Sequence, residues 1–297
     1  MAARLSLTLL GGFRARVGVR PVGVPLRKAR ALLAYLALTP GRAHTREGLA
    51  ALLWGDRADA HARNSLRQTL FGLRKALAAA RLPCLELAAD VVALRPGAID
   101  VDVAAFERLA VSSVDDDLAA AAAMYRGDLL AGLSVADPGF EEWLALERER
   151  LRHVAVAALT RLLDHQLDSA SPEQAMATAR RLLALEPLQE SVHRTLMRLS
   201  LERGQRAAAL RQYRACAATL QRELGTEPEP ETKALYRRIV QVGAGVTADV
   251  ADPSAEAMPL VGRRRELTAL LEQLAAAGAG RGRIVAVLGE LESARRG

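Results

Sequence analysis

One stretch of the sequence, Ala58 to Ala79, constrains the fold more than any other. Its leucines recur at intervals of four, three and four residues, which is the spacing of one stripe on an α-helix. The stripe consists of Leu66, Leu70, Leu73 and Leu77. At about 100° per residue, the face outside this stripe carries four Lys/Arg, two amides and no acid. An ordinary solvated helix mixes both signs of charge, so the pattern favours a helix whose outer face recognises DNA.

A basic surface helix with nothing docked on it has the same pattern, so the rest of the chain has to decide. The net charge of +7 is distributed unevenly. Residues 1–98 hold 16 Lys/Arg against 5 Asp/Glu, a net of +11, whereas residues 99–256 hold 18 against 25, a net of −7. A basic region followed by an acidic one indicates a polyanion-binding module joined to a protein-interaction module.

The first hundred residues predict the parts of a winged helix. Those parts are two or three short antiparallel strands within Arg4–Val24, helices over Arg27–Leu38 and Arg46–Leu53, the long helix, and a hairpin of Cys84–Leu87 with Val91–Leu94. Thr45 is the expected N-cap of the second helix. In a winged helix the third helix enters the major groove and the hairpin forms the wing.

Three blocks of this region resemble a known family: PLRKARALLAYLAL, LAALLWGD and ARNSLRQTLFGLRKAL. They are similar to the DNA-binding domain of the SARP class, the bacterial regulators of antibiotic pathways, which carry an OmpR-like winged helix. The resemblance implies that the third helix enters the major groove and that the wing touches the backbone or the minor groove. Carried over by position, it implies groove contacts by Arg63, Asn64, Arg67, Gln68 and Phe71, and phosphate contacts by Arg74 and Lys75.

Base readout by these side chains has a physical basis, because Arg can donate two hydrogen bonds to guanine and Asn or Gln can pair with adenine. Arg63 and Arg74 lie closest to the leucine stripe, which makes a partly structural role an alternative for both. At the start of the first helix, the cluster of Arg27, Lys28 and Arg30 either clamps a phosphate or is solvated; the residues alone leave both open.

Residues 99–241 are predicted to form a second, all-α domain, with Ile99–Phe106 as the link into it. The predicted helices are Asp115–Leu130, Trp143–Leu167, Glu173–Leu185, Gln189–Glu202 and Gln205–Leu224. The segments starting at Ala175 and Ala209 superpose at an offset of 34 residues, the period of a tetratricopeptide (TPR) pair. The aromatic residues of this region are expected in its core: Tyr125, Trp143, Tyr213 and Tyr236.

Further blocks, YRGDLLAGL, EEWLALERERLR and ALRQYRACAATLQRELGTEPEPETKALYRRI, resemble the bacterial transcriptional activation domain that follows the winged helix in the same regulators. The predicted fold class is therefore mainly α with a small β component. An N-terminal winged helix-turn-helix over residues 1–98 precedes an all-α, TPR-like domain over residues 99–241.

The C-terminal part has two further predicted segments, a linker over residues 242–258 and an incomplete start of a signalling NTPase domain over residues 259–297. PLVGRRRELTALLEQL and RIVAVLGE resemble the opening of such a domain. Counting from Gly289, a P-loop requires Gly, Lys and Ser/Thr where this chain has Ala294, Arg295 and Arg296. We therefore expect no nucleotide binding.

Several other functions are not indicated by the sequence. Cys84 and Cys216 are too few for a disulfide framework or a thiolate metal site, and both are expected to be reduced. His44 and His61 are expected to be surface or capping residues. We expect no catalytic residue, cofactor or metal. Without a signal peptide or an apolar run of about 18 residues, a cytoplasmic protein with no membrane contact is expected.

These features predict a transcriptional activator that binds double-stranded promoter DNA and recruits RNA polymerase. The resemblance implies tandem direct repeats bound by two protomers, that is, a homodimer on DNA. Two alternatives come from other function classes: an ATPase-type signalling regulator with a degraded P-loop, and a TPR-type adaptor that binds only proteins.

Overall fold

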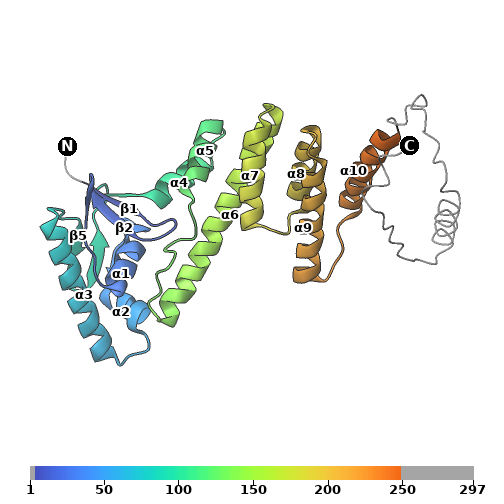
Figure 1. Cartoon of the computed structure of the whole chain (residues 1–297). Coiled ribbons are helices and arrows are strands. Elements are labelled where there is room, and N and C mark those ends of the chain that lie inside the picture. Colours follow the sequence, from blue (N-terminus) through green and yellow to red (C-terminus); the bar gives the residue numbers. More distant parts are fainter. Residues whose placement is uncertain (1–3, 249–297) are drawn as a thin grey trace, which may run out of the picture. The chain divides into compact units, whose positions relative to one another are not determined.

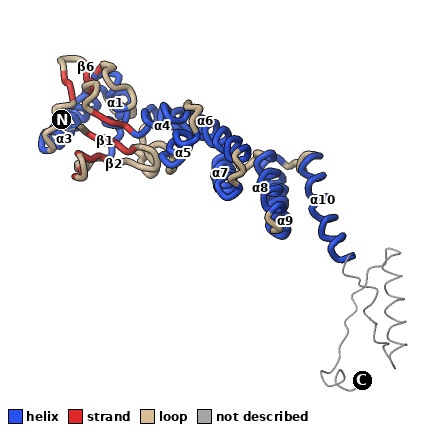
Figure 2. Tube along the Cα trace, turned by 90° about the horizontal axis from the view of Figure 1, so that it is seen from above, coloured by secondary structure: helices blue, strands red, loops and turns tan. Residues whose placement is uncertain are grey.

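The structure is a computed structural model that describes residues 4–248, with side chains described as far as Gln241. Residues 1–241 belong to one compact unit. In Figure 1 the strands and the first three helices occupy the N-terminal part of this unit, and a succession of helices follows. Figure 2 shows the same division by colour, with the red strands confined to the N-terminal part. This arrangement confirms the predicted fold class of a winged helix followed by a helical domain.

The first sheet has four strands in the order β3-β2-β1-β7. Strands β1 (Leu5–Thr8), β2 (Arg14–Val17) and β3 (Arg20–Pro21) are antiparallel neighbours, as predicted. Gly11 makes the turn after β1 at φ +82°, where an added Cβ would meet Arg126 at 3.2 Å. Both the backbone conformation and the close contact therefore require glycine here.

The fourth strand, β7 (Ile99–Val101), pairs in parallel with β1 and places Ile99 opposite Leu5. Helix α4 (Asp102–Ala110) follows directly. The sequence pattern predicts only a link over Ile99–Phe106, and this prediction is wrong because the segment contains strand β7 and the start of α4. A three-residue strand has too little alternation to be recognised, and it forms because β1 supplies its hydrogen bonds. The N-terminal sheet thus extends to Val101, beyond the predicted domain boundary at residue 98.

Three helices follow β3 in the order that the sequence predicts, and they pack against one another. They are α1 (Arg27–Ala37), α2 (Arg46–Trp54) and α3 (Asp59–Ala79). Thr45 caps α2, because its hydroxyl oxygen accepts a hydrogen bond from the Gly48 amide at 3.1 Å. The second sheet, in the order β4-β6-β5, consists of β4 (His44–Thr45), β5 (Leu85–Leu87) and β6 (Val91–Leu94). Strands β5 and β6 form the predicted hairpin.

His44 corrects one prediction, because it is buried rather than a surface or capping residue. Strand β4 pairs with β6 and turns the imidazole inward, where Nε2 lies 2.9 Å from the Thr39 hydroxyl oxygen. The ring also meets Tyr35 edge-on at 5.0 Å between centroids. His61, by contrast, is exposed on α3, as expected.

Six helices follow α4, and most of their bounds are close to the predicted ones. They are α5 (Asp115–Met124), α6 (Pro138–Asp168), α7 (Pro172–Leu185), α8 (Glu190–Glu202), α9 (Arg206–Leu224) and α10 (Pro230–Ala248). Consecutive helices from α4 to α9 pack against one another, which is the arrangement of a TPR-like array. Helix α10 is an addition to the predicted set.

The predicted helix Asp115–Leu130 ends early, at Met124, and the reason is tertiary. Leu129 and Leu130 are fully buried, and Leu129 forms a β-bridge with Leu10 near the end of β1. The Arg148 guanidinium donates to the carbonyl oxygens of both leucines, at 2.9 and 3.2 Å. These apolar residues therefore mark a packing contact between distant segments rather than a continuation of α5.

The hydrophobic core is shared by the winged helix and the helical region. One cluster of buried side chains runs from Leu5 in β1 to Leu199 in α8. At the junction, the start of α6 packs on α2, and Trp143 meets Tyr35 of α1 at 4.9 Å between ring centroids. The carboxylate of Asp102, at the start of α4, accepts hydrogen bonds from the amides of Leu9 and Leu10, at 2.9 and 3.0 Å. These contacts hold α6 and α4 directly on the N-terminal region.

The four aromatic residues predicted to lie in the core of the helical region do pack there. Tyr125 is buried next to Phe106, and Trp143 is partly buried against the main cluster. Tyr213 and Tyr236 stack at 4.1 Å between ring centroids in a smaller cluster formed by α8, α9 and α10.

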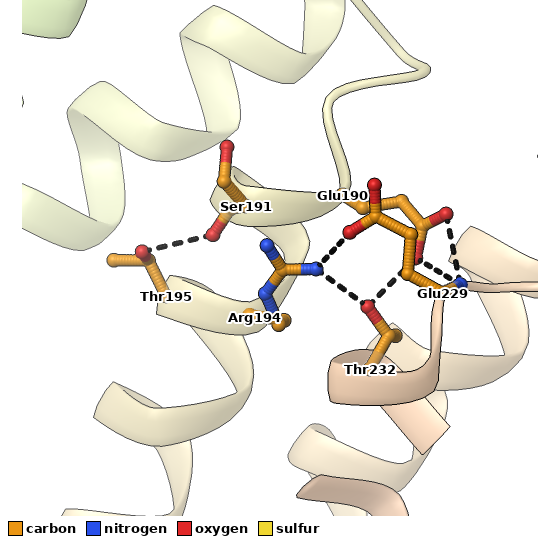
Figure 3. Close-up of polar contacts among 6 residues, drawn as sticks. All are labelled: Glu190, Ser191, Arg194, Thr195, Glu229 and Thr232. Carbon is orange, nitrogen blue, oxygen red and sulfur yellow. Dashed lines mark hydrogen bonds and ion pairs between the residues drawn. The ribbon is translucent and has the colours of Figure 1, made fainter. Parts of the chain in front are cut away.

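Helix α10 is fastened to α8 by a group of polar side chains, shown in Figure 3. The Glu190 carboxylate accepts hydrogen bonds from the Glu229 amide at 2.9 Å and from the Thr232 hydroxyl at 2.7 Å. Arg194, one turn along α8, donates to the Glu229 carboxylate at 2.6 Å and to the Thr232 hydroxyl oxygen at 2.9 Å. Because Glu190 accepts from the amide of Glu229, the residue directly before α10, this cluster caps the start of the helix.

The composition of the C-terminal part predicts a linker from Val242, whereas α10 continues as a helix to Ala248. The remainder of that linker and the predicted NTPase segment over residues 259–297 lie outside the described residues. The structure therefore does not bear on the P-loop positions Ala294, Arg295 and Arg296.

Candidate nucleic-acid interface

Helix α3 presents all seven predicted contact residues to solvent. Its buried side is formed by Ala62, Leu66, Thr69, Leu70, Leu73 and Leu77, which include the leucine stripe. The exposed side carries Arg63, Asn64, Arg67, Gln68, Phe71, Arg74 and Lys75. The alternative that Arg63 and Arg74 are partly structural gains no support, since both are exposed. The helix thus places every candidate on one continuous accessible surface, which we call the α3 face.

The cations of the α3 face have no carboxylate partner within the described chain. None of the ion pairs formed within residues 4–241 involves Arg63, Arg67, Arg74 or Lys75. Phe71 stands between these cations with 65% of its surface exposed. A concentrated positive charge around an exposed aromatic ring is suited to a polyanion with apolar groups, such as DNA.

One hydrogen bond orders the centre of the α3 face. Arg67 Nη2 donates to Asn64 Oδ1 at 2.8 Å, across one turn of the helix. Residues three apart on a helix are neighbours, so this contact is local and compatible with any packing of α3. It places the guanidinium beside the amide on the exposed side of the helix.

Gln68 lies at one edge of the α3 face, next to the helical region. It lines a cleft of about 470 Å³ with Ser65 and Thr69 of α3 on one side and the loop 134–136 on the other. Lys28 and Trp54 close the same cleft. Gln68 is therefore both exposed and adjacent to the junction, a position that the helical periodicity alone does not reveal.

The three cations at the start of α1 have different roles in the structure. Lys28 donates to the Leu53 carbonyl oxygen, lies 3.7 Å from the buried carboxylate of Asp137, and covers the Trp54 ring at 5.0 Å. Arg30 Nε donates to the Val24 carbonyl oxygen at 2.6 Å. Only Arg27 is exposed without such a contact among the described residues, so a phosphate clamp by all three is not what the structure presents.

The far end of α3 meets the hairpin at a second cleft, which contains a cation that the sequence pattern does not single out. The cleft has a volume of about 450 Å³, and it is lined by Arg74 and by Arg81 at the turn after α3. Arg81 is exposed and has a left-handed backbone conformation, with φ 58°. It lies beyond the periodic helix, so no periodicity could have identified it. Within the hairpin, Arg95 pairs with Glu86 at 3.1 Å.

Burial shifts the pKa of several of the histidines and cysteines of the described residues. No group of three His, Cys, Asp or Glu in this part of the chain is placed to hold a metal ion. Burial lowers the pKa of His44 and of His193, because the charged imidazolium is poorly solvated there. Burial likewise raises the pKa of Cys84, and raises that of Cys216 to about 11, so neither thiol is an activated nucleophile.

None of the helices in residues 4–248 combines the length and the apolar character needed to cross a lipid bilayer.

Comparison with known proteins finds a family match for the helical region. The family described as "Bacterial transcriptional activator domain" matches residues 101–240. The regulatory protein AfsR of Streptomyces coelicolor is 30% identical over 302 residues, covering 99% of this chain and 29% of AfsR. AfsR of Streptomyces griseus is 28% identical and is covered to 26% of its length. The chain thus spans under a third of either relative.

Two mycobacterial proteins extend the comparison. The transcriptional regulatory protein MoaR1 of Mycobacterium tuberculosis is 25% identical, covering 74% of this chain and 74% of MoaR1. The solved structure of EmbR from Mycobacterium tuberculosis, in complex with a low-affinity phosphopeptide, has a TM-score of 0.62 and 22% sequence identity. It covers 92% of this chain and 72% of EmbR, and this likeness concerns the fold. These similarities show that residues 101–240 match the bacterial transcriptional activator domain family, and that the chain is similar to AfsR and MoaR1, which are regulatory proteins.

Proposed function

We propose that this regulator is a sequence-specific DNA-binding activator that inserts α3 into the major groove of promoter DNA and recruits RNA polymerase through its helical region. The observation that carries the proposal is the α3 face, an exposed surface with four cations and no carboxylate partner within residues 4–241. Cations that are not neutralised within the protein are available to phosphates, which supply most of the salt-dependent affinity for DNA.

The side chains of the α3 face divide into two groups by chemistry. Arg67, Asn64 and Gln68 have the hydrogen-bonding groups that read base edges, and Phe71 offers an apolar surface for a thymine methyl group. Arg63, Arg74 and Lys75 supply phosphate contacts. Arg27 and Arg81, both exposed, are additional candidates for the backbone of the same duplex.

The helical region is assigned the contacts with other proteins. Residues 101–240 match the activator-domain family, and residues 99–256 carry a net charge of −7, so this region is not suited to phosphate binding. RNA polymerase and a second protomer are the proposed partners. Two protomers side by side on direct repeats would bring two α3 helices to the same face of the duplex.

The test is selection of binding sites from a randomised double-stranded DNA library with the purified chain, followed by affinity measurements on the enriched duplex. We expect one sequence to be enriched, and its affinity to fall steeply with salt. Arg67→Ala should weaken binding by about 1–3 kcal/mol. Arg214 is an exposed arginine on α9, so Arg214→Ala is the matched control and should leave the affinity unchanged.

Two results would refute this assignment in favour of another function class. If the chain binds no duplex at any salt concentration while a partner protein is retained, the protein-only adaptor becomes the better account. Saturable binding of ATP in a titration would support the signalling ATPase instead, although the required Lys and Ser/Thr positions of a P-loop hold Arg295 and Arg296.

A further inference from the structure

The pair formed by Asn64 and Arg67 lies at the centre of the α3 face, joined by the hydrogen bond of 2.8 Å from Arg67 Nη2 to Asn64 Oδ1. Both side chains are exposed, and each makes no other hydrogen bond or ion pair within the described residues. We propose that the two side chains read DNA as one unit, which selects guanine over adenine. This inference rests on the proposed function, since it presupposes that α3 enters the major groove.

The selectivity follows from the groups that the hydrogen bond leaves free. An asparagine that reads adenine donates from its amide to N7 and accepts from the N6 amino group at Oδ1. Here Oδ1 already accepts from Arg67, and the positive guanidinium beside it opposes the approach of another donor. Oδ1 keeps a second lone pair, but beside this charge the groups best placed to bind a base are the amide NH₂ and the other N–H groups of the guanidinium, which are all donors.

Guanine is the base that matches such a surface. Its major-groove edge presents two acceptors, N7 and O6, whereas adenine presents one acceptor and one donor. Arg67 retains enough N–H groups to donate to both acceptors while still holding Asn64. The usual preference of asparagine for adenine is therefore not expected at this position.

The hydrogen bond also prepares Arg67 for binding. A free arginine side chain loses much rotational freedom when it is fixed against a base, and this loss reduces affinity. Asn64 restricts the guanidinium before DNA arrives, and none of the ion pairs within residues 4–241 draws Arg67 away. Gln221 is an exposed amide on α9, outside the α3 face, so it serves as the matched amide control.

The experiment compares binding sites selected from a randomised duplex library by the wild-type chain and by Asn64→Ala, Arg67→Ala, the control Gln221→Ala and the double variant Asn64→Ala/Arg67→Ala. The positions are all exposed, and thermal melting of each variant confirms that it is folded. We expect Arg67→Ala to reduce the guanine-over-adenine preference at one position by about 5- to 150-fold. Asn64→Ala should weaken the same position by about 2- to 10-fold, because Arg67 loses its restraint.

The double variant distinguishes a unit from two independent contacts. If the two side chains act as a unit, the loss in the double variant is clearly smaller than the two single losses combined, and Gln221→Ala leaves the guanine position unchanged. An adenine preference that Asn64→Ala abolishes and Arg67→Ala leaves intact would overturn the proposal, as would losses that simply combine. In both of those cases DNA binding itself would stand. Enrichment of no sequence by any of the proteins would instead contradict the proposed function, and the pair with it.

Discussion

Arginines on the α3 face and arginines near the helix ends of the helical region have different partners. On the α3 face, Arg63, Arg67 and Arg74 point to solvent without a carboxylate partner in the described part of the chain. In the helical region, arginines close the structure on itself: Arg161 donates to the carbonyl oxygens of Ala110 and Ser112, and Arg206 to those of Ile239 and Val240. The residue type is the same, but its partners decide whether the charge is available to a ligand.

Several arginines of the helical region donate hydrogen bonds to carbonyl groups at the ends of neighbouring helices. The last carbonyl groups of each helix have no partner within that helix and have to be satisfied otherwise. Arg161 on α6 reaches the end of α4, and Arg181 on α7 reaches the carbonyls of Ala122 and Tyr125 at the end of α5. The comparison teaches that a high arginine content indicates a nucleic-acid surface only where the guanidinium groups are not used internally.

The largest expected effect tests whether the winged helix and the helical region unfold independently of each other. Phe140 is fully buried at the start of α6, the helix that packs on α2. Phe140→Ala should lower the free energy of unfolding by about 3–5 kcal/mol, because it leaves a cavity in the shared core. We expect a single unfolding transition in which winged-helix and helical signals are lost together, measured by denaturant titration. Two separate transitions would contradict a shared core.

A second, smaller effect is expected from the internal arginines. Arg161→Ala leaves the carbonyl groups at the end of α4 without their donor, and should lower the free energy of unfolding by about 1–3 kcal/mol. DNA affinity, measured by fluorescence anisotropy, should not change. Arg63→Ala is the matched variant on α3, and it should leave stability within about 0.5 kcal/mol while weakening DNA binding. A loss of DNA affinity in Arg161→Ala together with a loss of stability in Arg63→Ala would contradict the roles assigned to these two arginines.

The phosphate contacts sharpen the comparison within the α3 face itself. Lys75→Ala should weaken binding to all duplexes alike and reduce the slope of log affinity against log salt by about 1, because one fewer counterion is released. The measurement is anisotropy over a salt series, on the selected site and on an unrelated duplex. A change in the selected sequence, rather than in the slope, would place Lys75 among the base contacts.

The smallest expected effect is a pH dependence of the free energy of unfolding, which comes from a buried histidine in the helical region. The ring nitrogens of His193 lie 3.0 Å from the Pro187 carbonyl oxygen and 2.7 Å from the Gln212 amide, and burial lowers the pKa of the ring. The unfolded chain therefore binds more protons than the folded one as the pH falls through about 6.5, the ordinary histidine pKa. Stability is fully present above that pH and decreases below it.

The check is the free energy of unfolding at pH 7.5 and pH 5.5 for the wild-type chain and for His193→Gln. The variant should lose less stability on acidification, and the remaining loss includes His44, whose pKa is lowered in the same direction. His61 is exposed on α3, so His61→Gln is the control and should behave like the wild-type chain. An equal loss in all three proteins would exclude His193 as a source of the pH dependence.

The sequence by itself determined the elements that are long enough to carry a period. The leucine stripe from Leu66 to Leu77 predicted α3 and its exposed face, and the patterns around it predicted the winged helix and most of the helical region. Each of these elements buries one side, and the spacing of apolar residues within the element itself is enough to predict which side that is.

Only the tertiary structure decided the features whose partners are distant in the chain. Strand β7 exists because β1 is beside it, and Lys28 contacts the Leu53 carbonyl oxygen and Asp137, which are distant in the sequence. Helix α10 is fixed by Glu190 and Arg194, almost forty residues earlier. A short strand or a charged side chain has no period of its own, so what it does depends on which segment the fold brings against it.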